Sequence, residues 1–295
     1  MSAATAAAPQ QETTFRDRSA WAEMWSAFTR NRAALAGLII LAVIVLIALF
    51  APWIAPHDPT AQHLELRREG PSADAWFGRD EFGRDILSRL MYGARATLLA
   101  AAGAILLSGV VGTVIGILSA YQGKVVDSLF MRAMDIILAF PYFLLAILIV
   151  AVAGPSLRNA AIAIGITYIP QYARVVRGAA LEIVGKEYIE AARASGVHGF
   201  LIAIRHVLPN VVAPITVITT VGLALAIVGV SSLSFLGLGA QPPSPEWGAM
   251  LAAGREYVTS APHICIFPGL VILVTVLALN LVGDGFRDTF DPTMR

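Results

Sequence analysis

Long apolar blocks without charged residues dominate the pattern of this sequence. A membrane-spanning helix needs about 20 predominantly apolar residues to cross a hydrocarbon core of about 30 Å. Six blocks free of Asp, Glu, Lys and Arg occupy residues 33–55, 97–121, 136–154, 159–173, 211–238 and 264–283. The fourth block is the shortest. The pattern predicts an all-α fold, a polytopic membrane helix bundle with about six transmembrane helices.

The polar segments between the blocks set the expected topology. Lys and Arg favour the cytoplasmic side of a membrane, and placing both termini there puts 13 of these residues inside and 8 outside. The predicted divisions are a cytoplasmic N-terminal segment (1–32), a first transmembrane helix (33–55), an outer loop with an interfacial helix (56–96), a five-helix core (97–283) containing a cytoplasmic loop (174–210), and a cytoplasmic tail (284–295).

Proline and glycine mark special positions inside the apolar blocks. Pro141 removes a backbone donor from the third block and should kink it. Gly109, Gly112 and Gly116 place small residues where another helix can approach closely. We interpret these glycines as packing positions rather than as parts of a gate.

Composition excludes several kinds of protein. Only 14% of the residues are charged, against the roughly 25% of soluble domains, and the net charge of +1 indicates no nucleic-acid partner. The single cysteine, Cys265, cannot form an internal disulfide. The five histidines follow no metal-ligand spacing. We therefore expect membrane lipid around the chain and no metal or redox centre within it.

The loop 174–210 is the most informative polar segment. Apolar residues recur at helical spacing in two stretches, which contain Leu181, Val184 and Tyr188, then Leu201, Ile204 and Leu208. Gly196 and Gly199 lie between these stretches and suit a sharp turn, and Pro209 should limit the second helix. The loop is thus predicted to form a helix–turn–helix on the inner face, with apolar stripes that need a cover.

A motif with fixed spacing runs through this loop. Glu190-Ala191-Ala192 is followed after three residues by Gly196, and Leu208-Pro209 follows further on. The spacing resembles the cytoplasmic signature of the permeases of bacterial ABC importers, which reads EAA, three residues, Gly, nine residues, Ile, one residue, Leu-Pro. His206 stands where the general pattern has Ile, and the sequence RHVLPN of residues 205–210 is similar to the peptide and nickel subgroup.

The resemblance implies a specific role for the chain. It would be a type I ABC importer permease of the dipeptide and oligopeptide subgroup, in the bacterial inner membrane. It would work with a homologous permease, two ATP-binding subunits that hold ATP and Mg²⁺, and an external solute-binding protein. The chain itself would have no catalytic residue and no cofactor. The residues that the resemblance assigns to ATPase coupling are Glu190, Ala191, Ala192, Gly196, Arg205, His206, Leu208 and Pro209.

Other segments extend the resemblance over most of the chain. They are residues 28–59, 76–98, 234–251 and 283–292. In the second of these segments Arg79 replaces a usual Thr, and we expect a charged helix start lying at the outer interface. In the third, Trp247 suits the interfacial region. This third segment is interpreted as a structural cap, with a contact to the binding protein as the alternative.

Alternative functions remain open at this stage. The chain has no GxxxxGK[ST] phosphate loop, so ATP hydrolysis would need another chain. An ion-coupled secondary transporter often carries ionisable residues in its spans, which these spans lack. An integral membrane enzyme would want clustered carboxylates or histidines, and the one dense charge cluster, 79–95, reads as interfacial structure. Among substrates, peptides, nickel chelates and glutathione stay possible.

Single residues of the motif also have simpler interpretations. Glu190 could pair only with Arg193, three residues along the same helix, in a surface contact worth a few tenths of a kcal/mol. His206 could be a solvated helix residue or a pH-responsive contact, and we favour the first.

Overall fold

The computed structural model describes residue 26 and residues 28–290 of the 295-residue chain. This part of the chain is mainly helical and contains no named strand. Its helices are α2 (Arg32–Ile54), α3 (Ile86–Tyr121), α4 (Lys124–Leu138), α5 (Tyr142–Ala153), α6 (Leu157–Val184), α7 (Glu187–Ala194), α8 (Gly199–Ile202), α9 (Leu208–Phe235), α10 (Trp247–Gly254) and α11 (His263–Phe290). The all-α prediction is confirmed. Most of the predicted segment 1–32 and the end of the predicted tail 284–295 lie outside the described residues.

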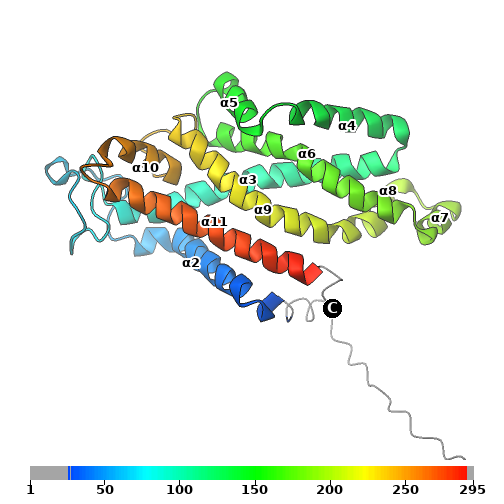
Figure 1. Ribbon diagram of the computed structural model, residues 1–295, viewed down its shortest axis with the longest axis horizontal. Coiled ribbons are helices and arrows are strands. Elements are labelled where there is room, and N and C mark those ends of the chain that lie inside the picture. The colour runs from blue at the N-terminus through cyan, green and yellow to red at the C-terminus, as the bar shows by residue number, and fades with distance from the viewer. Residues whose placement is uncertain (1–25, 27, 291–295) are drawn as a thin grey trace, which may run out of the picture.

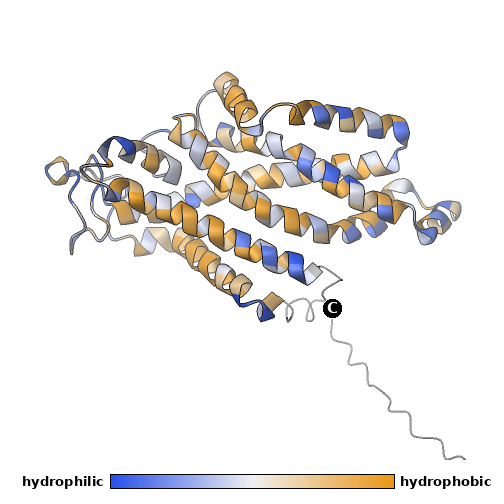
Figure 2. Ribbon diagram, viewed as in Figure 1, coloured by the Kyte–Doolittle hydropathy of each residue, from blue (hydrophilic) through white to orange (hydrophobic). Residues whose placement is uncertain are grey.

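The long helices run side by side along the longest axis of the molecule (Figure 1). Helices α3, α6 and α9 form the centre, α11 and α2 flank them on one side, and α4 and α5 lie on the other. The loop before α3 and helix α10 lie at one end, whereas α7 and α8 lie at the opposite end. Figure 2 shows hydrophobic residues along most of α2, α9 and α11. The two polar ends are therefore separated by an apolar bundle.

The number of spans is lower than the sequence predicts when length and composition are the criteria. Among the described residues, four helices qualify: Arg32–Ile54, Ile86–Tyr121, Gly199–Phe235 and His263–Thr289. The bent pair α4 and α5 makes a fifth if it is one span. The predicted fourth span, 159–173, lies inside the 28-residue helix α6, which is not among these candidates. The count of about six stays a prediction.

The third predicted span is broken rather than merely kinked. Helices α4 and α5 meet at 88°, and Pro141 is the residue that precedes α5. Proline has no N–H to donate to the preceding turn and its ring clashes with the carbonyl four residues back. The predicted kink is therefore confirmed in position at Pro141, and the structure shows it as a break between two helices.

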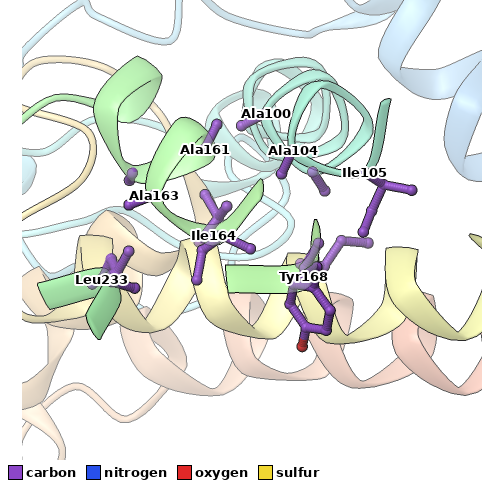
Figure 3. Close-up of a cluster of buried hydrophobic side chains, with 14 of the residues drawn as sticks. Ala100, Ala104, Ile105, Ala161, Ala163, Ile164, Tyr168 and Leu233 are labelled. Atoms are coloured by element: carbon purple, nitrogen blue, oxygen red, sulfur yellow. The ribbon is translucent and has the colours of Figure 1, made fainter. Parts of the chain in front are cut away.

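Small side chains let α3 and α6 pack closely. Figure 3 shows Ala100 and Ala104 of α3 near Ala161 and Ile164 of α6, in a buried cluster that also includes Leu233 of α9. Further along, a Cβ atom on Gly112 would lie 2.4 Å from the Cβ of Tyr172. On Gly116 it would lie 2.7 Å from the carbonyl oxygen of Ala173. The packing role predicted for these two glycines is confirmed.

Because of this contact, alanine substitution should have different effects on stability at two glycines of α3. We expect Gly112→Ala to lower the stability of the protein by about 1–3 kcal/mol, because the new methyl group overpacks the α3–α6 contact. Gly103→Ala is the matched control, since no heavy atom lies within 4 Å of its Cβ position. Thermal unfolding in detergent measures both. Equal Tm values for the two variants would contradict the close α3–α6 contact.

The charged residues before α3 form a buried network, not an interfacial helix. The Asp80 carboxylate accepts a hydrogen bond from Arg84 Nε at 2.6 Å and lies 3.3 Å from Arg89 Nε. All three side chains are about 5% exposed. Asp85 then caps α3 by accepting a hydrogen bond from the Ser88 N–H at 2.8 Å. The predicted interfacial helix is in fact the first turns of the long helix α3.

Glu81 belongs to the same network, but only one of its two carboxylate oxygens has a hydrogen-bond partner among the described residues. Its Oε1 accepts a hydrogen bond from Arg84 at 2.9 Å, whereas its Oε2 is buried without a partner among the described residues. Burial raises the pKa of Glu81 above its ordinary 4.5, and the neighbouring Asp80 adds to this shift. The ionised carboxylate is therefore less favourable in the folded protein than in the unfolded chain.

Glu81→Gln should consequently change the dependence of stability on pH. A carboxyl group with a raised pKa stabilises the fold fully below its unfolded value and loses that stabilisation as pH rises through the folded value. Relative to the parent, we expect the Tm of Glu81→Gln to increase as the pH is raised above about 4.5. Thermal unfolding at pH 4 and pH 7 measures this. A Tm difference that is the same at both pH values would contradict it.

The segment after α9 is a buried structural connection. Gly237 ends α9 with a φ of 79°, and Leu238 N–H donates to the Leu233 carbonyl at 2.9 Å. Trp247 is fully buried and donates from Nε1 to the Leu90 carbonyl at 3.0 Å. Glu246 caps α10 by accepting a hydrogen bond from Ala249 N–H at 2.8 Å. The interfacial position of Trp247 stays a prediction, and the structure agrees with a structural cap.

Candidate functional site

The motif residues lie at one tip of the molecule, beyond the ends of α3 and α6 (Figure 1). The chain leaves α6 at Val184, forms α7, turns, and re-enters the bundle through α8, a π-helical turn (Ala203–Val207) and α9. The predicted loop therefore begins later than expected, because residues 174–184 continue α6. The predicted apolar repeat from Leu181 to Tyr188 is divided by the break between α6 and α7.

The turn after α7 is fixed by Gly196. Its φ is 78°, which side chains with a Cβ adopt at a cost. Gly196 N–H donates to the Arg193 carbonyl at 2.9 Å, and Val197 N–H donates to the Ala192 carbonyl at 3.1 Å. These two bonds are the Schellman pattern that closes a helix C-terminus. The sharp turn predicted at Gly196 is therefore present.

Gly199 has a different role from the one that the sequence indicates. It is the first residue of α8, and a Cβ atom there would lie 2.5 Å from the Tyr121 ring at the end of α3. His198 caps α8, with its Nδ1 accepting from Phe200 N–H at 3.3 Å. The glycine is therefore needed for close approach to α3 rather than for a positive φ.

Pro209 does not limit the second helix, which corrects the prediction. Residues Gly199–Phe235 form one candidate span, and Pro209 lies in the first turn of α9. The preceding turn is π-helical, with Leu208 N–H donating to the Ala203 carbonyl five residues back. Asn210 Nδ2 also donates to the His206 carbonyl at 2.6 Å. A wider turn just before a proline lets the helix continue where a regular turn would be broken.

One side of the tip is anchored in a small core of its own. Ile189 of α7, Ile202 of α8 and Val207 of the π-helical turn are all 0% exposed. They belong to a cluster with Val176 of α6 and Val211 of α9. Because each short element contributes a buried branched side chain, the tip is held firmly against the bundle. We call this part of the tip, residues 187–207, the knob.

The other side of the tip exposes large apolar side chains. We define the tip surface as the exposed residues Tyr188, Glu190, Ala191, Phe200, Leu201, Ile204, Arg205, Leu208 and Pro209. Phe200 is 68% exposed and Ile204 is 45% exposed. Exposed apolar side chains gathered on one surface mark a contact site for another molecule. The apolar stripes expected from the sequence are therefore uncovered in the isolated chain.

The eight predicted site residues are brought together only in part. Six of them are exposed on or beside the tip surface, whereas Ala192 and His206 are half-buried. The ring of His206 lies 6.0 Å from the ring of Tyr188, joining the π-helical turn to α7. Tyr121 and Phe200 belong to this region as well and were missed, because neither is part of the motif and only the apolar face of residues 200–208 hinted at Phe200.

The charge of Glu190 is available to a partner. Within the described part of the chain Glu190 takes part in no ion pair or side-chain hydrogen bond. Arg193 instead lies over the Tyr121 ring, with its guanidinium carbon 4.9 Å from the ring centroid. The simple surface pair between Glu190 and Arg193 is thus absent. An exposed carboxylate beside apolar side chains can select a partner with a complementary charge.

A groove extends from the tip surface along the bundle. It has a volume of about 890 Å³ and runs between α3 and α9, with Phe200 and Ile204 at the tip end. The side chains that line it, all within the described residues, include no ionisable group. No group of three or more His, Cys, Asp or Glu in the described residues could hold a metal ion. The described residues of the site therefore offer an apolar surface for binding.

Comparison with known families identifies the chain. Residues 112–295 match the family described as binding-protein-dependent transport system inner membrane component. The chain belongs to this family. Residues 19–71 also match the N-terminal TM domain of oligopeptide transport permease C. The resemblance found in the motif of residues 190–209 is confirmed, and the family is one of membrane transport components and not of catalytic subunits.

Curated relatives of this permease cover nearly its whole length. A dipeptide transport system permease protein of Alkalihalophilus pseudofirmus is 44% identical over 97% of this chain and 94% of that protein. A di/tripeptide transport system permease protein of Pseudomonas aeruginosa is 43% identical over 92% of each. A glutathione transport system permease protein of Escherichia coli is 43% identical over 94% of this chain and 92% of that protein.

A solved structure shows the same fold at low sequence identity. The MetNI methionine ABC transporter, in an inward-facing conformation, contains a chain that matches with a TM-score of 0.56 and 20% identity. The match covers 70% of this chain and 98% of that chain. The permease is therefore a multi-pass inner-membrane protein with the helix arrangement of ABC importer permeases.

Proposed function

We propose that this permease forms, with a homologous permease, the pathway by which an ABC importer takes up dipeptides or short oligopeptides. Separate ATPase subunits would drive it through the tip surface. The observation that carries the proposal is the knob that holds the motif residues, on which Phe200, Ile204 and the unpaired Glu190 are all exposed. The names of the curated relatives support a short peptide as the substrate.

The knob can transmit a movement because one of its sides is buried against the bundle and the other is exposed. Ile189 and Ile202 fix it to α6 and α9 from within, so a push on the exposed side moves the ends of those helices. Only a partner that binds two conformations with different affinity can shift the balance between them. The ATPases would therefore grip the tip surface differently in their ATP-bound and nucleotide-free states, and alternating access would follow.

The proposed assembly supplies what the chain lacks. Two ATP-binding subunits would hold ATP and Mg²⁺, and an external solute-binding protein would deliver the peptide. This chain would contribute no catalytic residue and no cofactor. With the tip surface facing the ATPases, both termini would lie in the cytoplasm and the buried network around Asp80 would face outside.

Two other readings make different predictions. Glutathione is itself a short peptide and a relative at 43% identity is named for it, so it is the second candidate substrate, ahead of a nickel chelate. An ion-coupled secondary transporter would need ionisable residues along its path. The groove between α3 and α9 has none among its lining residues, which favours the ATP-driven importer.

Cross-linking from the tip surface tests the proposal. Ala191→Cys places a thiol beside Glu190, and the only native cysteine, Cys265, is replaced by Ser. We expect this variant to copurify with a second permease and with ATPase subunits, and to form a cross-link to an ATPase. Val125→Cys, an exposed residue on α4, is the control. Recovery of the chain alone, without cross-link, would contradict the assembly.

A further inference from the structure

The groove between α3 and α9 has a polar feature that the rest of its wall lacks. Most of the side chains that line it are aliphatic, for example Ile105, Ile117 and Leu223. Thr113 of α3 and Thr219 of α9 are the exceptions, and their hydroxyl groups are the only polar side-chain groups among the lining residues. Both threonines are half-buried. The groove therefore presents two hydroxyl groups on an otherwise apolar wall.

These two hydroxyl groups differ from others in the bundle because neither donates a hydrogen bond to a backbone carbonyl of its own helix. Ser108, Thr216 and Thr275 each donate a hydrogen bond to the carbonyl four residues back in their own helix. Thr113 has no hydrogen bond from its hydroxyl to any described residue. Both groove hydroxyls can thus form a hydrogen bond with a molecule in the groove.

Tyr172 behind the groove orients one of them. Its hydroxyl donates to Thr219 Oγ1 at 3.0 Å, and its ring is 0% exposed between α3, α6 and α9. Because Thr219 accepts this bond and donates none to the described residues, its own hydrogen is free to point away from Tyr172. A buried tyrosine that fixes the acceptor side of a hydroxyl leaves the donor side for a ligand.

We propose that the groove is the part of the peptide pathway formed by this subunit, and that Thr113 and Thr219 bind main-chain amide groups of the passing peptide. The proposal rests on the proposed function and names the residues at which the substrate is recognised. A carbonyl oxygen of a peptide would accept from Thr219, and Thr113 can donate or accept. Tyr172 acts as a positioning residue.

The volume and the neutrality of the groove favour this occupant over a permanently packed helix. A volume of about 890 Å³ lies in the range of small-molecule sites. An apolar helix filling it would leave both hydroxyls without an acceptor, which is unfavourable in a dry interface. A wall without charges also binds weakly enough to release what it holds, as conduction requires.

Continuity with the tip surface links the groove to the energy source. Ile204 and Phe200 belong to both features, and Ala203 of the π-helical turn lines the groove as well. A movement of the knob would therefore change the groove at its tip end. In this way the same short segment that contacts the ATPase would open the pathway toward the cytoplasm.

Valine replacements test the two hydroxyls in the complete assembly reconstituted in vesicles. Threonine and valine have the same shape, so Thr113→Val and Thr219→Val each remove one hydrogen bond. We expect each to lower the maximal ATP-driven uptake of dialanine about threefold to tenfold, the value of one neutral hydrogen bond. The subunit composition of the assembly should stay unchanged. Thr216→Val, on the same helix but bonded to its own backbone, should transport normally.

Thiol labelling separates a pathway from a sealed interface. Thr219→Cys in a Cys265→Ser background should react with N-ethylmaleimide in the assembled transporter, and saturating dialanine should slow the reaction. A thiol that does not react, or whose reaction dialanine does not slow, would overturn the groove proposal. Normal uptake by the variant that combines Thr113→Val and Thr219→Val would also overturn it. By contrast, absence of ATP-driven dialanine uptake by the parent assembly would contradict the proposed function itself.

Discussion

Gly196→Pro is expected to abolish ATP-driven peptide uptake while the protein still accumulates in the membrane. Gly196 has a φ of 78°, whereas proline holds φ near −65° and has no N–H to donate to the Arg193 carbonyl. A cost of about 3 kcal/mol or more lowers the population of the correctly shaped knob roughly a hundredfold. Uptake by vesicles and ATP hydrolysis by the purified assembly measure the effect.

Two companion variants separate the turn from the surface that it presents. Gly196→Asn should keep most of the uptake, because asparagine tolerates the left-handed conformation. Glu190→Lys leaves the backbone unchanged and reverses a charge that has no partner in the described part of the chain, so it should uncouple ATP hydrolysis from uptake without unfolding the knob. Normal uptake by both Gly196→Pro and Glu190→Lys would overturn the coupling role of the tip surface.

Asp80→Ala should be among the most destabilising single changes in the loop before α3. It removes the shared partner of Arg84 and Arg89, both of which are about 5% exposed. Leaving a buried charge without its partner costs about 3–5 kcal/mol, which corresponds to a decrease in Tm on the order of 10 °C. Thermal unfolding of the purified protein measures the loss.

An exposed ion pair of similar length provides the control. Asp135 lies 2.6 Å from Arg174, but both side chains are more than half exposed. Because the protein does not bury this pair, Asp135→Ala should cost about 0–1 kcal/mol. If the two alanine variants unfold at the same temperature, burial of the network around Asp80 does not contribute as the structure indicates.

The sequence predicts those features of the knob that depend only on neighbouring residues. Gly196 after Glu190-Ala191-Ala192 predicts a sharp turn, and in the structure α7 ends at Ala194 and the chain turns at Gly196. Pro209 misled the prediction, because a proline usually ends a helix and nothing local announces the π-helical turn Ala203–Val207 that lets it continue. Gly199 likewise owes its place to Tyr121, a residue far away in the sequence.

The charged segment before α3 shows what cannot be predicted from composition alone. A run containing Arg79, Asp80, Arg84 and Arg89 resembles a solvated interfacial helix, because charged residues are rarely buried. Burial of charged side chains becomes favourable only when they pair with each other. Here the Asp80 carboxylate pairs with both Arg84 and Arg89. The pairing geometry depends on how the loop folds back on α3, which helical periodicity does not report. The burial of Trp247 could not be predicted for the same reason, since its partner is the carbonyl of Leu90.

The most direct test of the central claim is the energy source of uptake. The assembly containing this permease is reconstituted in vesicles with its binding protein, and uptake of labelled dialanine is measured with ATP inside or with a proton or sodium gradient alone. We predict uptake that requires ATP hydrolysis, is lost with Glu190→Lys, and does not respond to the gradients. Uptake driven by a gradient through this chain alone, without ATP and without partner subunits, would contradict the account.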